Sequence, residues 1–544
     1  MWEKLKPICL ALVFVMVFSS VTAYAQDNAG LPKEPKYIFL FLGDGMSLSV
    51  IKAAEYYNGW KASGRIEKQP FNFSTFPAFG MVDTYSNSSF ITGSDGAGTA
   101  IATGYKANDR HIGVLPDGSM PPSIAKILQE EKGMQVGLVT SVTINDASTA
   151  SFYAHVENRS LMHEIAMQIG DSGFNFISGA IALATPDEWV NNGLPSGRGP
   201  AEDAYDYAIS QGYTVINTRE GIDALTAEDD KVIVSVADEY LVHLNWDEAG
   251  HQYYIDKGAN DYTLADAVRK GIEVMSDSEN GFFMVAELGR LDWALHANDG
   301  ITAMKEIQGM HDAVAEALAV YEQYPDETLI IVTGDHETGG FSIGYAETEY
   351  MMYFDIADYQ TISHENFYIL FDDFVKAAEA RGEQPAFENI LPAVTQYFGL
   401  KFEGDPADDV MVVKPEELME LREAFDLNIT PKADRDTRAY GFRATYGSNS
   451  YEPFTIAVLR LMNNRVGIGF TTFQHTAVPV PIYALGTGAE KFAGNIDNTD
   501  IYWLIREVSN LSTRDQAPAQ LAPQGPASAP DWPVWPARPP LPRE

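Results

Sequence analysis

The chain has 544 residues and carries 37 lysine and arginine residues against 76 aspartate and glutamate residues, a formal net charge of −39 at pH 7. This length allows two to four domains and a large buried core. A field of this sign repels nucleic acid and anionic lipid, so we expect no nucleic-acid-binding surface. An anionic ligand would need a locally positive site, which bound cations could supply.

Residues 1–25 have the pattern of a secretory signal. Two lysines precede the apolar run ICLALVFVMVF, and the small residues of AYA (23–25) fit a cleavage site before Gln26. The run is too short to span a membrane. We therefore expect an exported protein, periplasmic or extracellular, with no stable membrane anchor. The single cysteine, Cys9, lies in this signal, so the mature chain would have neither a disulfide nor a cysteine metal ligand.

Apolar runs alternate with helical patterns along most of the chain. The runs that predict buried strands are YIFLFLGDG (37–45), MQVGLVTSVT (134–143), GFFMVAELG (281–289), TLIIVTGDH (328–336) and PVPIYALGTG (479–488). The segments that predict helices include 123–133, 263–275 and 301–324. Nearly continuous apolar strands are typical of parallel sheets covered on both faces. We therefore predict an α/β fold, a three-layer sandwich with a mainly parallel central sheet, helices on both faces and a large insertion.

Between about 340 and 460 the composition shifts to aromatic and acidic residues. Segment 364–382 is amphipathic, and segment 414–425 begins with a proline suited to a first helical turn. We interpret this region as an insertion within one catalytic domain over 26–515. Residues 516–544 contain nine prolines, which predicts an extended or disordered tail.

Metal-ligand residue types stand at or near the ends of several predicted strands. They are Asp44, Glu287, Asp292, His296, Asp335, His336 and His475. Ligands of open α/β sheets bind beyond the carboxyl ends of the strands, so these side chains can converge there. Mixed oxygen and nitrogen sites suit zinc, and all-oxygen sites suit magnesium. Each residue alone could be a helix cap, a turn residue or a surface group, but the ordered set predicts a metal centre.

The stretch ITGSDGAGTAIATG (91–104) places Ser94 just ahead of a run of small residues. The local sequence allows two interpretations. Ser94 is either a nucleophile at the start of a helix or a polar residue in a flexible turn.

Taken in order, these motifs resemble those of the alkaline phosphatase family, from about Lys36 to Trp503 and excluding much of the insertion. The family's strand–Gly-Asp-Gly-Met turn matches GDGMS around Asp44, and its nucleophile stands ten residues before a glycine, as Ser94 stands before Gly104. Its magnesium and phosphate motif is similar to DASTASFYAHVENR, which offers Asp146, Ser148 and Arg159. The Glu-x4-Asp-x3-His motif, the Asp-His pair and the late histidine match the ligand residues named above.

The resemblance implies a secreted, homodimeric alkaline phosphatase that hydrolyses phosphate monoesters through a phosphoserine on Ser94, with Arg159 binding the phosphoryl oxygens. It also implies two Zn²⁺ and one Mg²⁺. One zinc would be held by Asp292, His296 and His475, and the second by Asp44, Asp335 and His336. The magnesium would be held by Asp44, Ser148 and Glu287, with Asp146 holding its water shell.

The match departs from the family pattern beside the nucleophile. Many members carry an aspartate there that helps to hold the phosphate-binding arginine, but this chain has Gly93. Either Arg159 is held more loosely, or Asp95 on the other side of Ser94 replaces that aspartate. An alternative alignment places Asp95 at the aspartate position and Gly96 at the nucleophile, but it breaks the ten-residue spacing.

Two further positions differ in smaller ways. Ser148 replaces the usual threonine, and its hydroxyl can still bind magnesium. Trp293 follows the zinc aspartate and supplies no cation, so we expect weaker phosphate affinity and faster product release.

Two other functions compete with a phosphomonoesterase. The first is a related hydrolase of diesters or sulfate esters, although the sequence has no Cys/Ser-x-Pro-x-Arg setting of the sulfatase type. The second is a protein that binds metal or phosphate without turnover, which Gly93 makes plausible.

Overall fold

The computed structural model describes residues 34–180, 204–235, 251–436, 441–447 and 451–513. The predicted signal (1–25) and the proline-rich tail (516–544) lie outside these residues. Among the described residues, no helix is both long and apolar enough to cross a bilayer.

A ten-stranded sheet forms the centre of the molecule, with strand order β14-β2-β13-β8-β1-β7-β3-β4-β6-β5. Its strands are β1 (Tyr37–Gly43), β2 (Ala78–Asp83), β3 (Gln135–Thr143), β4 (Phe176–Ala180), β5 (Thr214–Ile216), β6 (Val232–Ser235), β7 (Phe282–Leu288), β8 (Thr328–Gly334), β13 (Val480–Gly486) and β14 (Gly494–Asp497). Only β13 runs against its neighbours, β2 and β8. The five predicted strands are β1, β3, β7, β8 and β13, so the mainly parallel sheet is confirmed.

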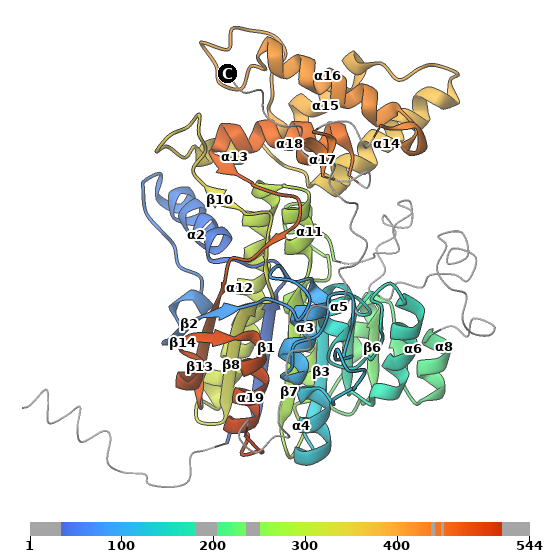
Figure 1. Cartoon of the computed structure of the whole chain (residues 1–544), viewed down its shortest axis with the longest axis vertical. Coiled ribbons are helices and arrows are strands. Elements are labelled where there is room, and N and C mark those ends of the chain that lie inside the picture. Colours follow the sequence, from blue (N-terminus) through green and yellow to red (C-terminus); the bar gives the residue numbers. More distant parts are fainter. Residues whose placement is uncertain (1–33, 181–203, 236–250, 437–440, 448–450, 514–544) are drawn as a thin grey trace, which may run out of the picture.

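Two hydrophobic cores cover the two faces of the sheet. Along β1, Ile38, Leu40 and Leu42 belong to one core, whereas Phe39 and Phe41 belong to the other, because successive side chains of a strand point to opposite faces. The first core includes residues of α3, α4, α6 and α19, and the second includes residues of α2, α10 and α12. The result is the predicted three-layer sandwich (Figure 1).

The sheet is covered by the helices of the two outer layers. They are α2 (Leu48–Ser63), α3 (Ser94–Thr103), α4 (Ile124–Lys132), α5 (Ala147–Ala150), α6 (Met162–Ser172), α8 (Ala204–Ser210), α9 (Arg219–Ala224), α10 (Leu264–Val274), α11 (Arg290–His296), α12 (Gly300–Gln323) and α19 (Asn498–Val508). The predicted helices 123–133, 263–275 and 301–324 correspond to α4, α10 and α12.

A helical layer stands at the top of the molecule in Figure 1, on the side to which the carboxyl ends of most strands point. It contains α13 (Phe354–Ala357), α14 (His364–Ala380), α15 (Phe387–Phe398), α16 (Pro415–Ile429), α17 (Phe442–Tyr446) and α18 (Pro453–Val466). Phe425 of α16 packs against aromatic rings of three other helices in this layer. Its ring centroid lies 5.7 Å from that of Phe371, 5.6 Å from that of Phe387 and 5.8 Å from that of Phe454. α16 extends past the predicted end at 425, because Leu427 and Ile429 still pack against this core.

α12 carries a buried carboxyl group whose ionisation opposes folding. Glu306 is 4% exposed, and its Oε2 accepts a hydrogen bond of 2.7 Å from the backbone N–H of Tyr254. Burial raises its pKa from 4.5 to about 7. Because the folded-state pKa lies above the unfolded one, stability from the neutral carboxyl is complete at low pH and is lost as pH rises through 7.

We therefore expect Glu306→Gln to stabilise the protein at pH 8 by about 2 kcal/mol, and to change the stability much less at pH 5. The amide keeps an oxygen for the Tyr254 N–H but carries no charge. Chemical denaturation at the two pH values measures the difference. Glu322→Gln, an exposed position on the same helix, is the matched control. Identical pH dependences for Glu306→Gln and the control would contradict the prediction.

Candidate metal centre and active site

The predicted ligand residues converge at the carboxyl edge of the central strands. β1, β7 and β8 are neighbours in register, so that Gly43 lies opposite both Leu288 and Gly334. Asp44 follows β1, and Asp335 and His336 follow β8, while Glu287 is the penultimate residue of β7. α11 begins directly after β7, which brings in Asp292 and His296. The last residue, His475, lies in β12 (His475–Thr476), which pairs with β9 (Glu337–Thr338) beside His336.

Asp292, His296 and His475 form one group of donors. The two imidazole Nε2 atoms lie 3.0 Å apart, and Nε2 of His296 lies 3.3 Å from Oδ2 of Asp292. Each Nδ1 bonds to a backbone carbonyl, that of Phe473 at 2.6 Å and that of Thr92 at 2.7 Å. Because a carbonyl only accepts, each Nδ1 carries a proton, and in the neutral imidazole Nε2 then has the lone pair that can bind a cation. Two lone pairs and a carboxylate directed at one point fit a zinc-type cation.

Asp44, Asp335 and His336 form a second group, with ligand atoms within 4.8 Å of one another. Nε2 of His336 lies 3.4 Å from Oδ1 of Asp44 and 3.2 Å from Oδ2 of Asp335. Oδ1 of Asp44 has no hydrogen-bond donor among the described residues. Burial, followed by repulsion from neighbouring carboxylates, raises the pKa of Asp44 well above its usual range and that of Asp335 to about 8. A bound cation would remove this cost.

His336 lies between the two groups. Its ligand atom is also within 4.8 Å of those of Asp292 and His475, and its ring centroid is 3.6 Å from that of His475. The two donor sets therefore form one continuous centre. Thr338, which the sequence analysis did not single out, donates from its hydroxyl to Oδ1 of Asp292 at 2.5 Å.

Ser148 and Glu287 lie on the other side of Asp44. The Ser148 hydroxyl is 3.5 Å from Oδ2 of Asp44 and 3.4 Å from Oδ2 of Asp335. Oε2 of Glu287 accepts hydrogen bonds from the hydroxyls of Thr140, at 2.7 Å, and Thr149. Burial nevertheless raises the pKa of Glu287 to about 7. These oxygen donors suit a magnesium-type cation.

Ser94 is the first residue of α3, and its Oγ lies 3.1 Å from Nε2 of His336, directly beside the metal centre. The helix is buried throughout, so the flexible-turn interpretation does not fit. Its small residues allow a close approach to α5, since a Cβ on Gly98 would lie 2.8 Å from the Ser151 hydroxyl and 3.1 Å from Cα of Ser148. The sequence ITGSDGAGTAIATG thereby brings the nucleophile candidate next to the segment that carries Ser148.

Arg159 reaches the same place from the loop after α5. Its Nη1 bonds to Oδ2 of Asp95 at 3.0 Å, and its Nη2 bonds to Oδ1 of Asp146 at 2.7 Å. Burial would lower the pKa of Arg159, but the two carboxylates outweigh it and raise the pKa. Of the two possibilities left by Gly93, the structure has the one in which Asp95 bonds to the arginine.

Trp293 stands beside a cation that is already paired. The guanidinium of Arg290 lies 5.0 Å from the Trp293 ring centroid, and both oxygens of Glu365 accept from its Nη1 at 2.7 Å. Arg290 is 1% exposed. The expectation of weaker phosphate affinity at this position stays a prediction.

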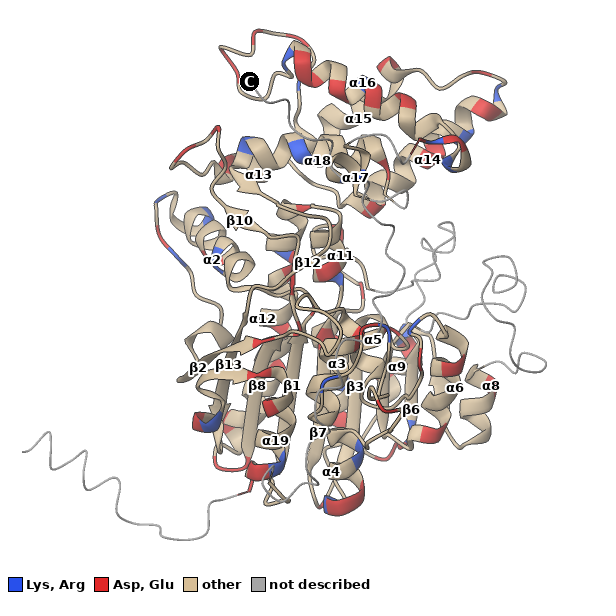
Figure 2. Cartoon of the chain, viewed as in Figure 1, with Lys and Arg blue, Asp and Glu red and all other residues tan. Residues whose placement is uncertain are grey.

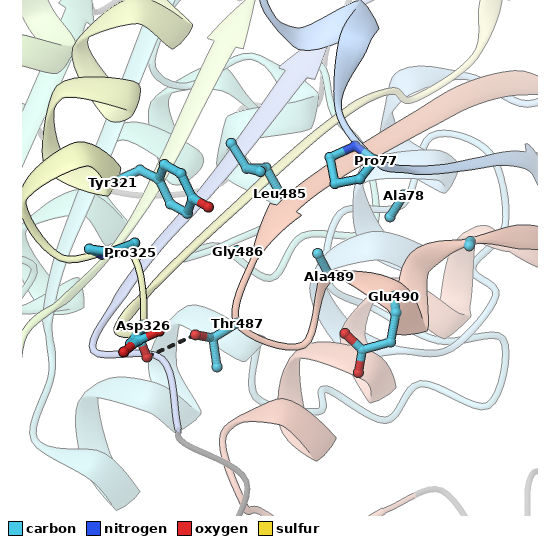
Figure 3. Close-up of a pocket in the computed structure, with 11 residues that line it drawn as sticks. Pro77, Ala78, Tyr321, Pro325, Asp326, Leu485, Gly486, Thr487, Ala489 and Glu490 are labelled. Carbon is cyan, nitrogen blue, oxygen red and sulfur yellow. Dashed lines mark hydrogen bonds between the residues drawn. The ribbon is translucent and has the colours of Figure 1, made fainter. Parts of the chain in front are cut away.

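A cavity of about 490 Å³ opens at the opposite end of the sheet. Figure 3 shows it between Tyr321 and Pro325, before β8, and the segment from Leu485 to Glu490, which begins at the end of β13. β8 has seven residues and separates it from Asp335 by about 20 Å. Its charged lining residues, Asp326 and Glu490, are both acidic, so this cavity does not suit an anionic substrate.

The sequence of this chain matches the family model described as alkaline phosphatase over residues 35–175 and 201–511. The chain belongs to the alkaline phosphatase family. Alkaline phosphatase 4 of Bacillus subtilis is 27% identical over 515 residues, covering 92% of this chain and 95% of the relative. The alkaline phosphatase of Schizosaccharomyces pombe is 24% identical over 542 residues, covering 96% and 91%.

Solved structures of alkaline phosphatases have a similar fold. The cold-active alkaline phosphatase of a psychrophilic Shewanella species superposes with a TM-score of 0.66 and 26% identity, covering 87% of this chain and 99% of that one. The Thermus thermophilus alkaline phosphatase has the same fold, with a TM-score of 0.64 and 22% identity, covering 90% of this chain and 94% of that one. Membership of the alkaline phosphatase family over most of its length makes this chain a phosphoric monoester hydrolase.

Proposed function

We propose that this enzyme is exported and hydrolyses phosphate monoesters through a phosphoserine on Ser94, at a centre of two Zn²⁺ and one Mg²⁺. The observation that carries the proposal is the place of Ser94. Its hydroxyl stands at the start of α3, 3.1 Å from His336, within one continuous set of ligand residues. The paired Nε2 lone pairs and the partnerless Asp44 oxygen are what cation-binding residues look like before the cation is added.

The ligand sets follow the family pattern. Asp292, His296 and His475 would hold one zinc, Asp44, Asp335 and His336 the other, and Asp44, Ser148 and Glu287 the magnesium, with Asp146 holding its water shell. Bound there, the ions supply Lewis acidity and neutralise the charge of the phosphate ester. Since the protein is strongly acidic, with aspartate and glutamate prominent on α4, α6, α14 and α16 in Figure 2, a local positive site is needed to admit the substrate.

The chain's own residues bind and orient the phosphoryl group. The first turn of α3 offers backbone N–H groups and the positive end of the helix dipole. Arg159 is fixed by Asp95 and Asp146, and its remaining N–H groups can bond to two phosphoryl oxygens. Ser94 Oγ displaces the alcohol of the monoester, which leaves a phosphoserine. Water then attacks the phosphorus, restores the serine and releases inorganic phosphate.

Thr149→Val should weaken Mg²⁺ binding by about tenfold, because outer-shell hydrogen bonds orient a ligating carboxylate. The substitution keeps the shape of the side chain but removes one of the two hydroxyls that bond to Glu287. Titration of Mg²⁺ into the zinc-loaded protein by calorimetry measures the change. Thr143→Val is the matched control, since its hydroxyl is buried without a hydrogen-bond partner among the described residues. Equal Mg²⁺ affinities of the two variants would contradict this role for Thr149.

Export rests on the pattern of the first 25 residues, and a homodimer rests on the family resemblance. A cell-fractionation experiment and the mass measured by light scattering test these two points separately. Retention of the full-length chain in the cytoplasm would contradict export, and a monomeric mass would contradict the dimer.

Substrate class is tested by comparing p-nitrophenyl phosphate, bis(p-nitrophenyl) phosphate and p-nitrophenyl sulfate under the same conditions. We expect the monoester to be hydrolysed far faster than the other two, because a dianionic phosphoryl group can bond to both Arg159 and the start of α3. A preference for the diester or the sulfate would favour another hydrolase of the superfamily. Phosphate binding without turnover of any ester would favour the binding protein.

A further inference from the structure

We propose that Asp95 is the positioning residue for Arg159, and that a glycine at position 93 leaves the Asp95 carboxylate uncrowded in this place. In this chain the aspartate that bonds to the arginine therefore follows Ser94, at position 95, and does not precede it at position 93. The inference rests on the proposed function, in which Arg159 binds the phosphoryl group.

The Asp95 carboxylate is fixed by three donors. Its Oδ2 accepts from Nη1 of Arg159 at 3.0 Å, while its Oδ1 accepts from the backbone N–H groups of Arg110, at 2.7 Å, and Gly96, at 2.8 Å. The side chain is 3% exposed. A buried carboxylate that two backbone N–H groups hold cannot follow a moving arginine, so it restricts the guanidinium instead.

Position 93 has the backbone of an ordinary residue. Gly93 has φ −87° and ψ 167°, an extended conformation open to any amino acid, and it precedes α3 as a cap residue without a side-chain hydrogen bond. A Cβ at this position would lie 3.0 Å from Oδ1 and 3.2 Å from Oδ2 of Asp95. A side chain at position 93 would therefore push the Asp95 carboxylate by a few tenths of an ångström, and the glycine avoids this crowding without using its conformational freedom. Once the Asp95 carboxylate is removed, an aspartate at 93 fits and is a favoured helix cap.

Arg110 connects the two partners through its main chain. Its N–H donates to Asp95, and its carbonyl accepts from the N–H of Arg159 at 2.8 Å. Arg110 has φ +73°, a left-handed conformation that is unfavourable for a residue with a side chain. Its guanidinium bonds to Asn158 at 3.0 Å and to Ser160 at 2.6 Å, on either side of Arg159. The strained residue thus holds Asp95 and the arginine-bearing loop in one arrangement.

The test compares the wild type with Asp95→Asn, Asp95→Ala and the double variant Gly93→Asp/Asp95→Ala. Binding of inorganic phosphate to the zinc- and magnesium-loaded protein is measured by calorimetry, and KM, kcat and inhibition by phosphate are measured with p-nitrophenyl phosphate. Asp117→Asn, which removes an exposed carboxylate bonded to Ser119, is the control. Circular dichroism establishes that each variant is folded.

We expect Asp95→Asn and Asp95→Ala to weaken phosphate binding and raise KM by about tenfold, as for the loss of one charge-assisted hydrogen bond. Adding Gly93→Asp to Asp95→Ala should restore phosphate binding to within about threefold of the wild type. Asp95→Ala and the double variant both lack the bond to the N–H of Arg110. The difference in phosphate affinity between them therefore reports only the carboxylate at position 93.

Two results would overturn the proposal. One is an Asp95→Asn variant that binds phosphate as tightly as the wild type and Asp117→Asn. The other is a double variant that binds phosphate no better than Asp95→Ala, which would make Asp95 a support for the backbone only. Failure of the proposed function would give a different result, because the wild type would then not hydrolyse the ester. Calorimetry would still compare phosphate binding among the variants, so the role of Asp95 is tested separately.

Discussion

Replacing Ser94 with alanine is expected to lower kcat for p-nitrophenyl phosphate by roughly three to six orders of magnitude. The substitution removes the only atom at this position that can accept the phosphoryl group, while the metal ligands and Arg159 stay in place. Phosphate binding should therefore survive. The measurement is initial-rate kinetics at mildly alkaline pH with zinc and magnesium present, together with calorimetric phosphate binding.

Ser89→Ala is the matched control, because Ser89 is an exposed serine of the same loop. It should retain nearly all of the wild-type rate. Equal rates for Ser94→Ala and the wild type would exclude Ser94 as the nucleophile. That result would reopen the alternative alignment around Asp95 and Gly96.

Removing the metals should abolish turnover and lower the thermal stability. Without cations, Asp44 and Asp335 repel each other inside the protein, and the Nε2 atoms of His296 and His475 face each other at 3.0 Å. A cation present at a hundred times its dissociation constant stabilises the folded state by about 2.7 kcal/mol per site. Chelation followed by dialysis, activity assays and thermal unfolding measures both effects, and added zinc and magnesium should restore both.

Measuring the metal content of variants distinguishes loss of a bound metal from unfolding of the protein. Asp292→Asn should lose one zinc per chain, because it removes the charged ligand from the set that Asp292 forms with His296 and His475. Asp312→Asn, on α12 and bonded to Gln308, should retain the wild-type metal content. A chelated, metal-free protein that hydrolyses the ester at the original rate would contradict the metal-centre account.

The sequence predicted the strands that are buried on both faces, because their apolar runs are long and continuous. It missed β4 and β6, which are buried but have only five and four residues, β2, where buried and exposed residues alternate, and the short β5 and β14, which have three and four residues. Such strands form because a neighbour offers hydrogen bonds, as β13 does for β2. Local composition carries little trace of them.

The ordered motifs predicted which residues meet at the site, but not what holds them. Thr140 and Thr149 bond to Glu287 across 147 and 138 residues of sequence, and Thr338 bonds to Asp292 across 46. Two of these threonines lie close to motif residues in the sequence, Thr149 after Ser148 and Thr338 two residues after His336. This proximity was the only feature of the sequence that pointed to a role for them at the site. The partner of Thr140 follows from the register of β3 and β7, whereas those of Thr149 and Thr338 follow from how α5 and β9 pack in the fold.

The most direct test of the central claim is to identify the phosphorylated residue. The enzyme is mixed with p-nitrophenyl phosphate or with inorganic phosphate, quenched in acid, digested and analysed by tandem mass spectrometry. We predict that the peptide containing Ser94 gains the mass of one phosphoryl group, located on that serine, and that Ser94→Ala shows no such peptide. Phosphorylation of a different residue, or normal turnover with Ser94 unmodified in every quench, would contradict the phosphoserine mechanism.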